Sequence, residues 1–124
     1  MKLPASGKTG FTLVEIMIVV ALVGLLAGIA APSMVRARTQ SQTNACINNL
    51  RQIDDASQEW ALEYHRAADA TVSFTDIQPY LKNAIICPAA GTGATFDSSY
   101  SITTVSNKPT CKVVSTTHKL LPDG

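Results

Sequence analysis

FTLVEIMIVVALVGLLAGIAA, residues 11–31, is a nearly unbroken apolar run on which the predicted architecture of the chain depends. As an α-helix its 21 residues would span roughly 31 Å, close to the thickness of a bilayer's hydrocarbon core. Glu15 is its one charged residue, and a carboxylate in an apolar medium is costly unless it has a partner. Residues 9–19 contain no lysine or arginine. The stretch therefore predicts a membrane-spanning helix whose carboxylate needs a cation from elsewhere.

Cleavage of the Gly10–Phe11 bond would create that cation. The new α-amine of Phe11 is cationic near neutral pH and would lie one helical turn from Glu15. It could meet the carboxylate of its own chain or that of a neighbour.

Residues 8–15, KTGFTLVE, resemble the class III (prepilin-type) signal of type IV pilins and type II secretion pseudopilins. In that family a membrane aspartyl peptidase cleaves after the glycine and methylates the new N-terminus. The resemblance implies that cleavage follows Gly10 and that Phe11 is the methylated first residue. It also implies that Glu15 neutralises the N-terminal amine of an adjacent subunit in a filament.

Gly24 and Pro32 fall where the family has its helix-loosening glycine and proline. Glycine costs backbone entropy and proline removes a hydrogen bond, so we expect a bend or a melted turn between them. Gly24 and Gly28 also form a Gly-x-x-x-Gly step, which allows close approach of helices in lipid or simply lowers bulk.

The predicted fold class is α+β and pilin-like, with a long N-terminal helix packed on a small C-terminal antiparallel β region. The segments are a cleaved leader, a membrane or filament-core helix, an amphipathic continuation of that helix, and a small head, at residues 1–10, 11–32, 33–66 and 67–124. The apolar stripe of the continuation recurs at steps of three and four and is read as core: Cys46, Leu50, Ile53, Ser57, Trp60 and Tyr64.

In the head, Thr75 and Gln78 predict a capping box that starts a short helix. Two strands are expected at residues 99–105 and 111–115, joined as a hairpin. The tail from residue 116 is expected to be irregular.

Three cysteines cannot all pair within one chain. We predict a Cys87–Cys111 disulfide, with Cys46 a free buried thiol; three reduced thiols are the alternative. A zinc site is not predicted, because there is no C-x-x-C and the two histidines, expected at the surface, lack ligand spacing. No cofactor is expected. Calcium, which major pseudopilins bind through an acidic loop, has thin support here, from Asp97 and Asp123.

Charge excludes some classes of partner. The chain has 10 basic and 9 acidic residues, and removal of Lys2 and Lys8 with the leader leaves a net charge near −1. No nucleic-acid partner is therefore expected. An ordinary secretory signal cut near residues 28–31 is the rival interpretation, but its apolar region would not contain Glu15.

The favoured function is a structural subunit of a type II secretion pseudopilus; a type IV pilin serving adhesion, twitching or DNA uptake is the alternative. A membrane-anchored or secreted small binding domain is the hypothesis from another class. No serine or histidine lies in a catalytic context, so no enzyme is predicted. The resemblance implies a single-pass inner-membrane precursor with a periplasmic head, then a periplasmic or extracellular filament. Its implied partners are other copies of the chain, prepilin peptidase, an inner-membrane assembly platform and minor pilins or pseudopilins.

Overall fold

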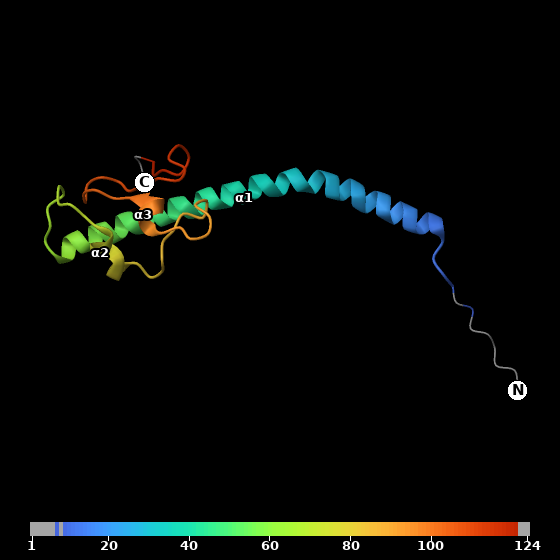
Figure 1. Ribbon diagram of the computed structural model, residues 1–124, viewed down its shortest axis with the longest axis horizontal. Helices are drawn as coiled ribbons and strands as arrows, with labels where there is room; N and C mark the ends of the chain where they lie inside the picture. The colour runs from blue at the N-terminus through green and yellow to red at the C-terminus, as the bar shows by residue number, and fades with distance from the viewer. Residues whose placement is uncertain (1–6, 8, 122–124) are drawn as a thin grey trace, which may run out of the picture. The chain divides into compact units, whose positions relative to one another are not determined.

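The computed structural model describes Gly7 and residues 9–121 (Figure 1). Its principal element is α1, Leu13–Glu63, a helix of 51 residues. The short elements that follow are α2 (Phe74–Ile77), the 3₁₀ helix η1 (Gln78–Tyr80), α3 (Phe96–Ser99), β1 (Tyr100–Ser101) and β2 (Thr110–Cys111). This is the expected α+β class, a long N-terminal helix and a small antiparallel sheet. The chain divides into two compact units, Met1–Ala37 and Arg38–Gly124, which are described separately.

In the first unit, α1 is helical from Leu13 onward and Pro32 lies inside it. Proline has no N–H, so the carbonyl of Gly28 cannot receive the usual helical bond from residue 32. The helix nevertheless continues through both glycines and the proline. Of the two alternatives expected for residues 24–32, the melted turn is wrong and the bend stays a prediction.

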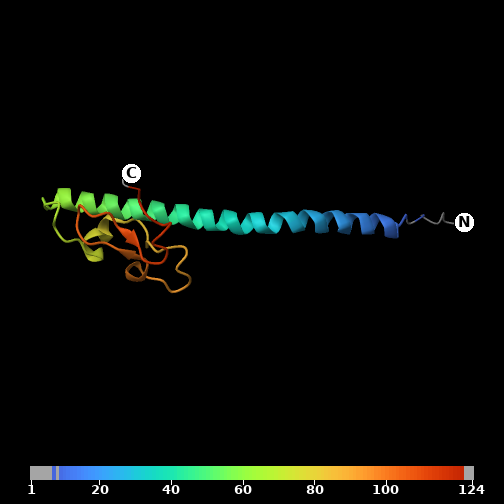
Figure 2. The ribbon, with the colours of Figure 1, turned by 90° about the horizontal axis from the view of Figure 1, so that it is seen from above.

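In the second unit, the short elements and loops lie along one side of the second half of α1 (Figure 2). The predicted stripe is confirmed as core at five of its six positions, including Trp60, which is 8% exposed. Tyr64 is the exception, at 58% exposed. It lies beyond the last residue of α1, where the chain leaves the packed face. Residues from the later segments complete the core: Val72, Ile77, Ile85, Cys87, Phe96, Tyr100, Val105 and Cys111.

The end of α1 explains the position of Tyr64. The amide of Arg66 donates to the carbonyl of Ala61 at 2.8 Å, and that of His65 to Leu62 at 3.4 Å. These two bonds form a Schellman motif, which requires a left-handed residue at the position of His65. His65 has φ of 49°, a conformation in which histidine is enriched among non-glycine residues. The helix therefore ends at Glu63, three residues before the predicted end.

The β region is much shorter than the two predicted strands. β1 and β2 pair antiparallel through Tyr100 with Cys111 and Ser101 with Thr110. The following residues bond elsewhere: the amide of Val105 donates to the carbonyl of Ala70 at 3.1 Å. Residues 103–105 thus pair with the segment after α1 instead of extending the hairpin. That competing partner is distant in sequence, and local periodicity gives no sign of it.

Candidate functional site

The predicted processing site lies in an exposed segment ahead of α1. Gly10 and Phe11 have no regular secondary structure, and the side chain of Phe11 is 85% exposed. A Cβ built on Gly10 meets no atom within 4 Å. An accessible, irregular peptide bond suits a protease. The rest of the predicted leader, residues 1–6 and 8, lies outside the described residues, and the assigned roles stay predictions.

Glu15 has a partner that the sequence interpretation overlooked. The backbone N–H and the hydroxyl of Thr12 donate to its Oε2 at 2.8 and 2.9 Å, and the amide of Glu15 lies 3.3 Å from the Thr12 Oγ1. Thr12 is thus the N-cap of α1 and Glu15 occupies the third helical position, a capping box. The spacing Thr-x-x-Glu was a readable signal for it. These partners are neutral, so the carboxylate keeps its charge available for a cation.

The first half of α1 carries a continuous apolar surface. Its large apolar side chains between Leu13 and Val35 are all exposed by half or more: Leu13, Val14, Ile16, Met17, Ile18, Val19, Val20, Leu22, Val23, Leu25, Leu26, Ile29, Met34 and Val35. By length and composition α1 is able to cross a membrane. A surface of this extent marks a site of membrane or protein contact. Gly24 and Gly28 both have open space at the Cβ position, so they offer flat patches on it.

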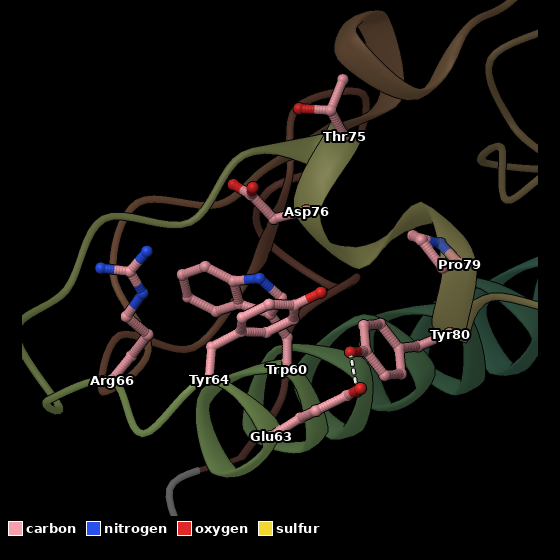
Figure 3. A pocket seen from close by; sticks show the side chains of 8 residues that line it. All are labelled: Trp60, Glu63, Tyr64, Arg66, Thr75, Asp76, Pro79 and Tyr80. Atoms are coloured by element: carbon pink, nitrogen blue, oxygen red, sulfur yellow. Dashed lines mark hydrogen bonds between the residues drawn. The ribbon is translucent and has the colours of Figure 1, made fainter.

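An aromatic groove of about 490 Å³ lies at the end of α1 in the second unit (Figure 3). The guanidinium of Arg66 stands 5.6 Å from the centre of the Trp60 ring, within cation–π range. The Tyr80 hydroxyl donates to Glu63, and this carboxylate raises the pKa of Tyr80 to about 12. The phenol therefore remains neutral at physiological pH. The groove offers an aromatic face and both charge signs, which suits contact with another protein surface better than catalysis.

Asp76, at the edge of this groove, caps α2 together with Ser73. The amide and the hydroxyl of Ser73 donate to its Oδ2 at 2.9 and 2.5 Å. The predicted cap, Thr75, is wrong by two residues, because Ser73 has the extended backbone that an N-cap needs. The hydrogen bonds from Ser73, side chain first and backbone second, hold the pKa of Asp76 below its usual range.

We expect Ser73→Ala to raise the pKa of Asp76 toward its ordinary value. A depressed carboxyl pKa contributes stability above the unfolded-state pKa, and that contribution is lost as pH falls through the folded-state pKa. Between acid and neutral pH, the free energy of unfolding should therefore rise less in the variant than in the wild type. Titration of the Asp76 carboxylate carbon by NMR measures the shift directly. Thr75→Ala is the control; a larger shift there than in Ser73→Ala would restore the original capping prediction.

The cysteines and one histidine lie together in the second unit. Cys46, Cys87 and Cys111 are buried, and the sulfur atoms of Cys87 and Cys111 are 3.7 Å apart. Burial raises the pKa of Cys46 to about 12 and also raises that of Cys87. The Cys87–Cys111 disulfide stays a prediction. The surface position expected for His118 is wrong: it is 3% exposed, and its ring faces two of the thiols.

Calcium binding stays an expectation, because only one of the two acidic residues considered for it, Asp97, is described. The backbone carbonyl of Asp97 accepts a hydrogen bond from the Lys112 ammonium at 2.8 Å, so a positive charge already lies beside this residue. Asp123 lies outside the described residues. Among the described residues, one group of three or more potential metal ligands lies close together, and it consists of the three cysteines and His118.

A family model described as "Prokaryotic N-terminal methylation motif" matches residues 6–31. The match includes the predicted cleavage site and the first part of α1, so in this region the chain is similar to prepilin-type proteins. Its relatives include the type IV major pilin protein PilA of Myxococcus xanthus, 38% identical over 60 residues. Two type IV major fimbrial proteins FimA of Dichelobacter nodosus are 35% and 34% identical over 68 residues.

These similarities cover part of each protein. The alignments include 48% of this chain and 27% of the Myxococcus pilin, and 55% of this chain and 44% or 42% of the two FimA proteins. The chain thus spans less than half the length of the curated relatives it matches. No solved structure shows significant similarity to it.

Proposed function

We propose that this chain is the subunit of a type IV pilus-like filament, polymerised through the first half of α1. The observation that carries the proposal is the prepilin-type motif at residues 6–31 at the start of a helix whose apolar side chains are exposed. Outside the membrane these side chains must stay buried, because exposure of apolar surface to water costs about 25 cal/mol per Å². Packing of these helices against one another, in exchange for lipid, gives a filament core.

The relatives favour a pilus over the pseudopilus that ranked first from sequence. The curated relatives named above are type IV pilins or fimbrial proteins. Major pseudopilins bind calcium through an acidic loop, and this chain has little sign of such a loop. The weak calcium signal therefore also favours a pilus. Filaments on the cell surface support the pilus, whereas filaments confined to the periplasm support the pseudopilus.

The proposed life history starts with an inner-membrane precursor. Prepilin peptidase removes residues 1–10 and methylates Phe11; an assembly platform then extracts the helix into a filament of identical subunits, with minor pilins as further partners. The role is structural and needs no catalytic residue.

Gly10→Val should block this processing. The protein isolated from its native membrane should begin at Phe11 and carry one extra methyl group, whereas the variant should keep residues 1–10, because the proposed peptidase cleaves after glycine. The open space around Gly10 lets the chain itself accommodate the valine. Intact-mass measurement distinguishes the two forms. Gly7→Val, outside the scissile bond, is the control. A wild-type protein that still begins at Met1, or that starts after residue 31, would refute the proposed function.

A further inference from the structure

Four potential metal ligands from distant parts of the second unit converge in its core. Cys46 comes from α1, Cys87 from the segment between η1 and α3, Cys111 from β2 and His118 from the C-terminal segment. Each side chain is at most 3% exposed. One donor atom from each lies within 4.8 Å of all the others. The four residues are called the Cys₃His cluster below.

Three distances in the cluster match the edges of a zinc tetrahedron. Zinc–sulfur bonds of about 2.3 Å and zinc–nitrogen bonds of about 2.0–2.1 Å give sulfur–sulfur edges of roughly 3.8 Å and sulfur–nitrogen edges of roughly 3.6 Å. The Cys87 and Cys111 sulfurs are 3.7 Å apart, and they lie 3.8 and 3.9 Å from the Nδ1 of His118. The three distances to the Cys46 sulfur are at most 4.8 Å, so this sulfur needs to move by up to about 1 Å for all four atoms to reach one ion.

Thr43 fixes the tautomer of His118 that a metal requires. The Thr43 hydroxyl donates to the carbonyl of Thr39 at 3.0 Å, so its single proton is already engaged. The Nε2 of His118, 3.1 Å from the same oxygen, must then be the donor. In the neutral ring this leaves Nδ1 unprotonated, with its lone pair toward the sulfurs. A hydrogen bond donated by the ring nitrogen that does not bind the metal is the usual companion of a metal-bound histidine.

The Tyr100 hydroxyl is placed to donate a hydrogen bond to the Cys46 sulfur. Asn49 donates its Nδ2–H to the Tyr100 oxygen at 3.0 Å, which leaves the phenol proton to point elsewhere. The Cys46 sulfur lies 3.5 Å from that oxygen. The phenol is thus placed to donate to a thiolate, the form in which cysteine binds a metal.

We propose that the Cys₃His cluster binds one zinc ion as a closed structural site. Three thiolates and an imidazole select a soft or borderline cation. Four buried protein ligands leave no open position for water or substrate, which is the mark of a structural site. The ion would tie the C-terminal segment and β2 to α1, in a unit too small to have a large core.

Zinc binding and the predicted disulfide exclude each other. A Cys87–Cys111 bond would remove two of the three thiolates, so the state of the thiols decides between them. The full-length chain is purified anaerobically from membranes in mild detergent, without reductant or chelator. Metal content and intact mass are then measured on the same sample.

We expect one zinc per chain and a fully reduced mass. X-ray absorption should show three sulfurs near 2.3 Å and one nitrogen near 2.0 Å. All three thiols should resist alkylation until a chelator is added. Chains with a mass two hydrogens lower and no zinc would overturn the proposal in favour of the disulfide. Reduced chains that do not retain added zinc would overturn it equally.

Thr43→Ala tests the arrangement without removal of a ligand. Loss of the hydrogen bond between His118 and the Thr43 hydroxyl should weaken zinc binding by about 10- to 100-fold, measured by competition with a chromophoric chelator. His118→Ala should weaken it further. His65→Asn removes the chain's other histidine while tolerating the left-handed backbone, and should bind zinc like the wild type. Equal zinc affinity in all four proteins would contradict the assigned ligand set.

Discussion

Glu15→Gln is expected to abolish filament formation while the chain still inserts into the membrane. In the proposed filament the carboxylate meets the α-amine of Phe11 on a neighbouring subunit. A glutamine leaves that amine charged and unpaired in an apolar core, at a cost of about 3–5 kcal/mol. Each subunit added would then be disfavoured on the order of a hundredfold or more. Insertion should not suffer, since removal of a charge favours residence in lipid. Electron microscopy of sheared filaments and membrane fractionation give the two readouts.

The capping box supplies the controls. Glutamine at this position can still accept the hydrogen bonds of Thr12, so Glu15→Gln removes the charge and keeps the cap. Thr12→Ala does the opposite: it removes the hydroxyl that lies 2.9 Å from Glu15 and keeps the carboxylate. We expect Thr12→Ala to assemble with a yield close to that of the wild type, since an N-cap contributes about 1 kcal/mol.

The reverse pattern would change the interpretation. Wild-type filaments from Glu15→Gln together with none from Thr12→Ala would show that Glu15 serves to start the helix. The axial register of subunits would then depend on some other contact. Glu15→Ala removes both functions and should be the most defective of the three.

The sequence predicts those features of the chain that depend on local pattern. The apolar run from residue 11 and the three-four spacing of Leu50, Ile53 and Trp60 identify the long helix and its buried face, because helical periodicity is a property of neighbouring residues. The same reasoning could have found the Thr12–Glu15 capping box. The ends of elements were less well predicted. Tyr64 fitted the spacing of the stripe, but the Schellman motif ends α1 at Glu63 and leaves Tyr64 exposed.

Features that depend on distant segments escaped prediction. The pairing of Val105 with Ala70 shortened the expected hairpin, and His118 entered the core next to cysteines 7 and 31 residues earlier in the chain. Zinc motifs are recognised by short ligand spacing, whereas here each ligand comes from a different element. The fold alone brings them together, so the cluster could not be read from spacing.

Tyr100→Ala is expected to destabilise the second unit by about 3–5 kcal/mol, which is typical of truncating a buried aromatic side chain. Tyr100 is 1% exposed and packs on Phe96 with ring centres 5.8 Å apart. A loss of that size is a large fraction of the 5–15 kcal/mol of a typical domain. Urea unfolding followed by the fluorescence of Trp60, the chain's one tryptophan, measures it.

Two variants separate packing from hydrogen bonding at this position. Tyr100→Phe keeps the ring and should cost about 1 kcal/mol, since Asn49 retains its bond to the carbonyl of Ile86 at 3.0 Å. Tyr64→Ala truncates an exposed tyrosine and should cost less than about 1 kcal/mol. Each variant is unfolded with saturating zinc and with a chelator, because a bound ion adds its own stability to the native state. If Tyr64→Ala were as costly as Tyr100→Ala, the core would lie at the aromatic groove and not around β1.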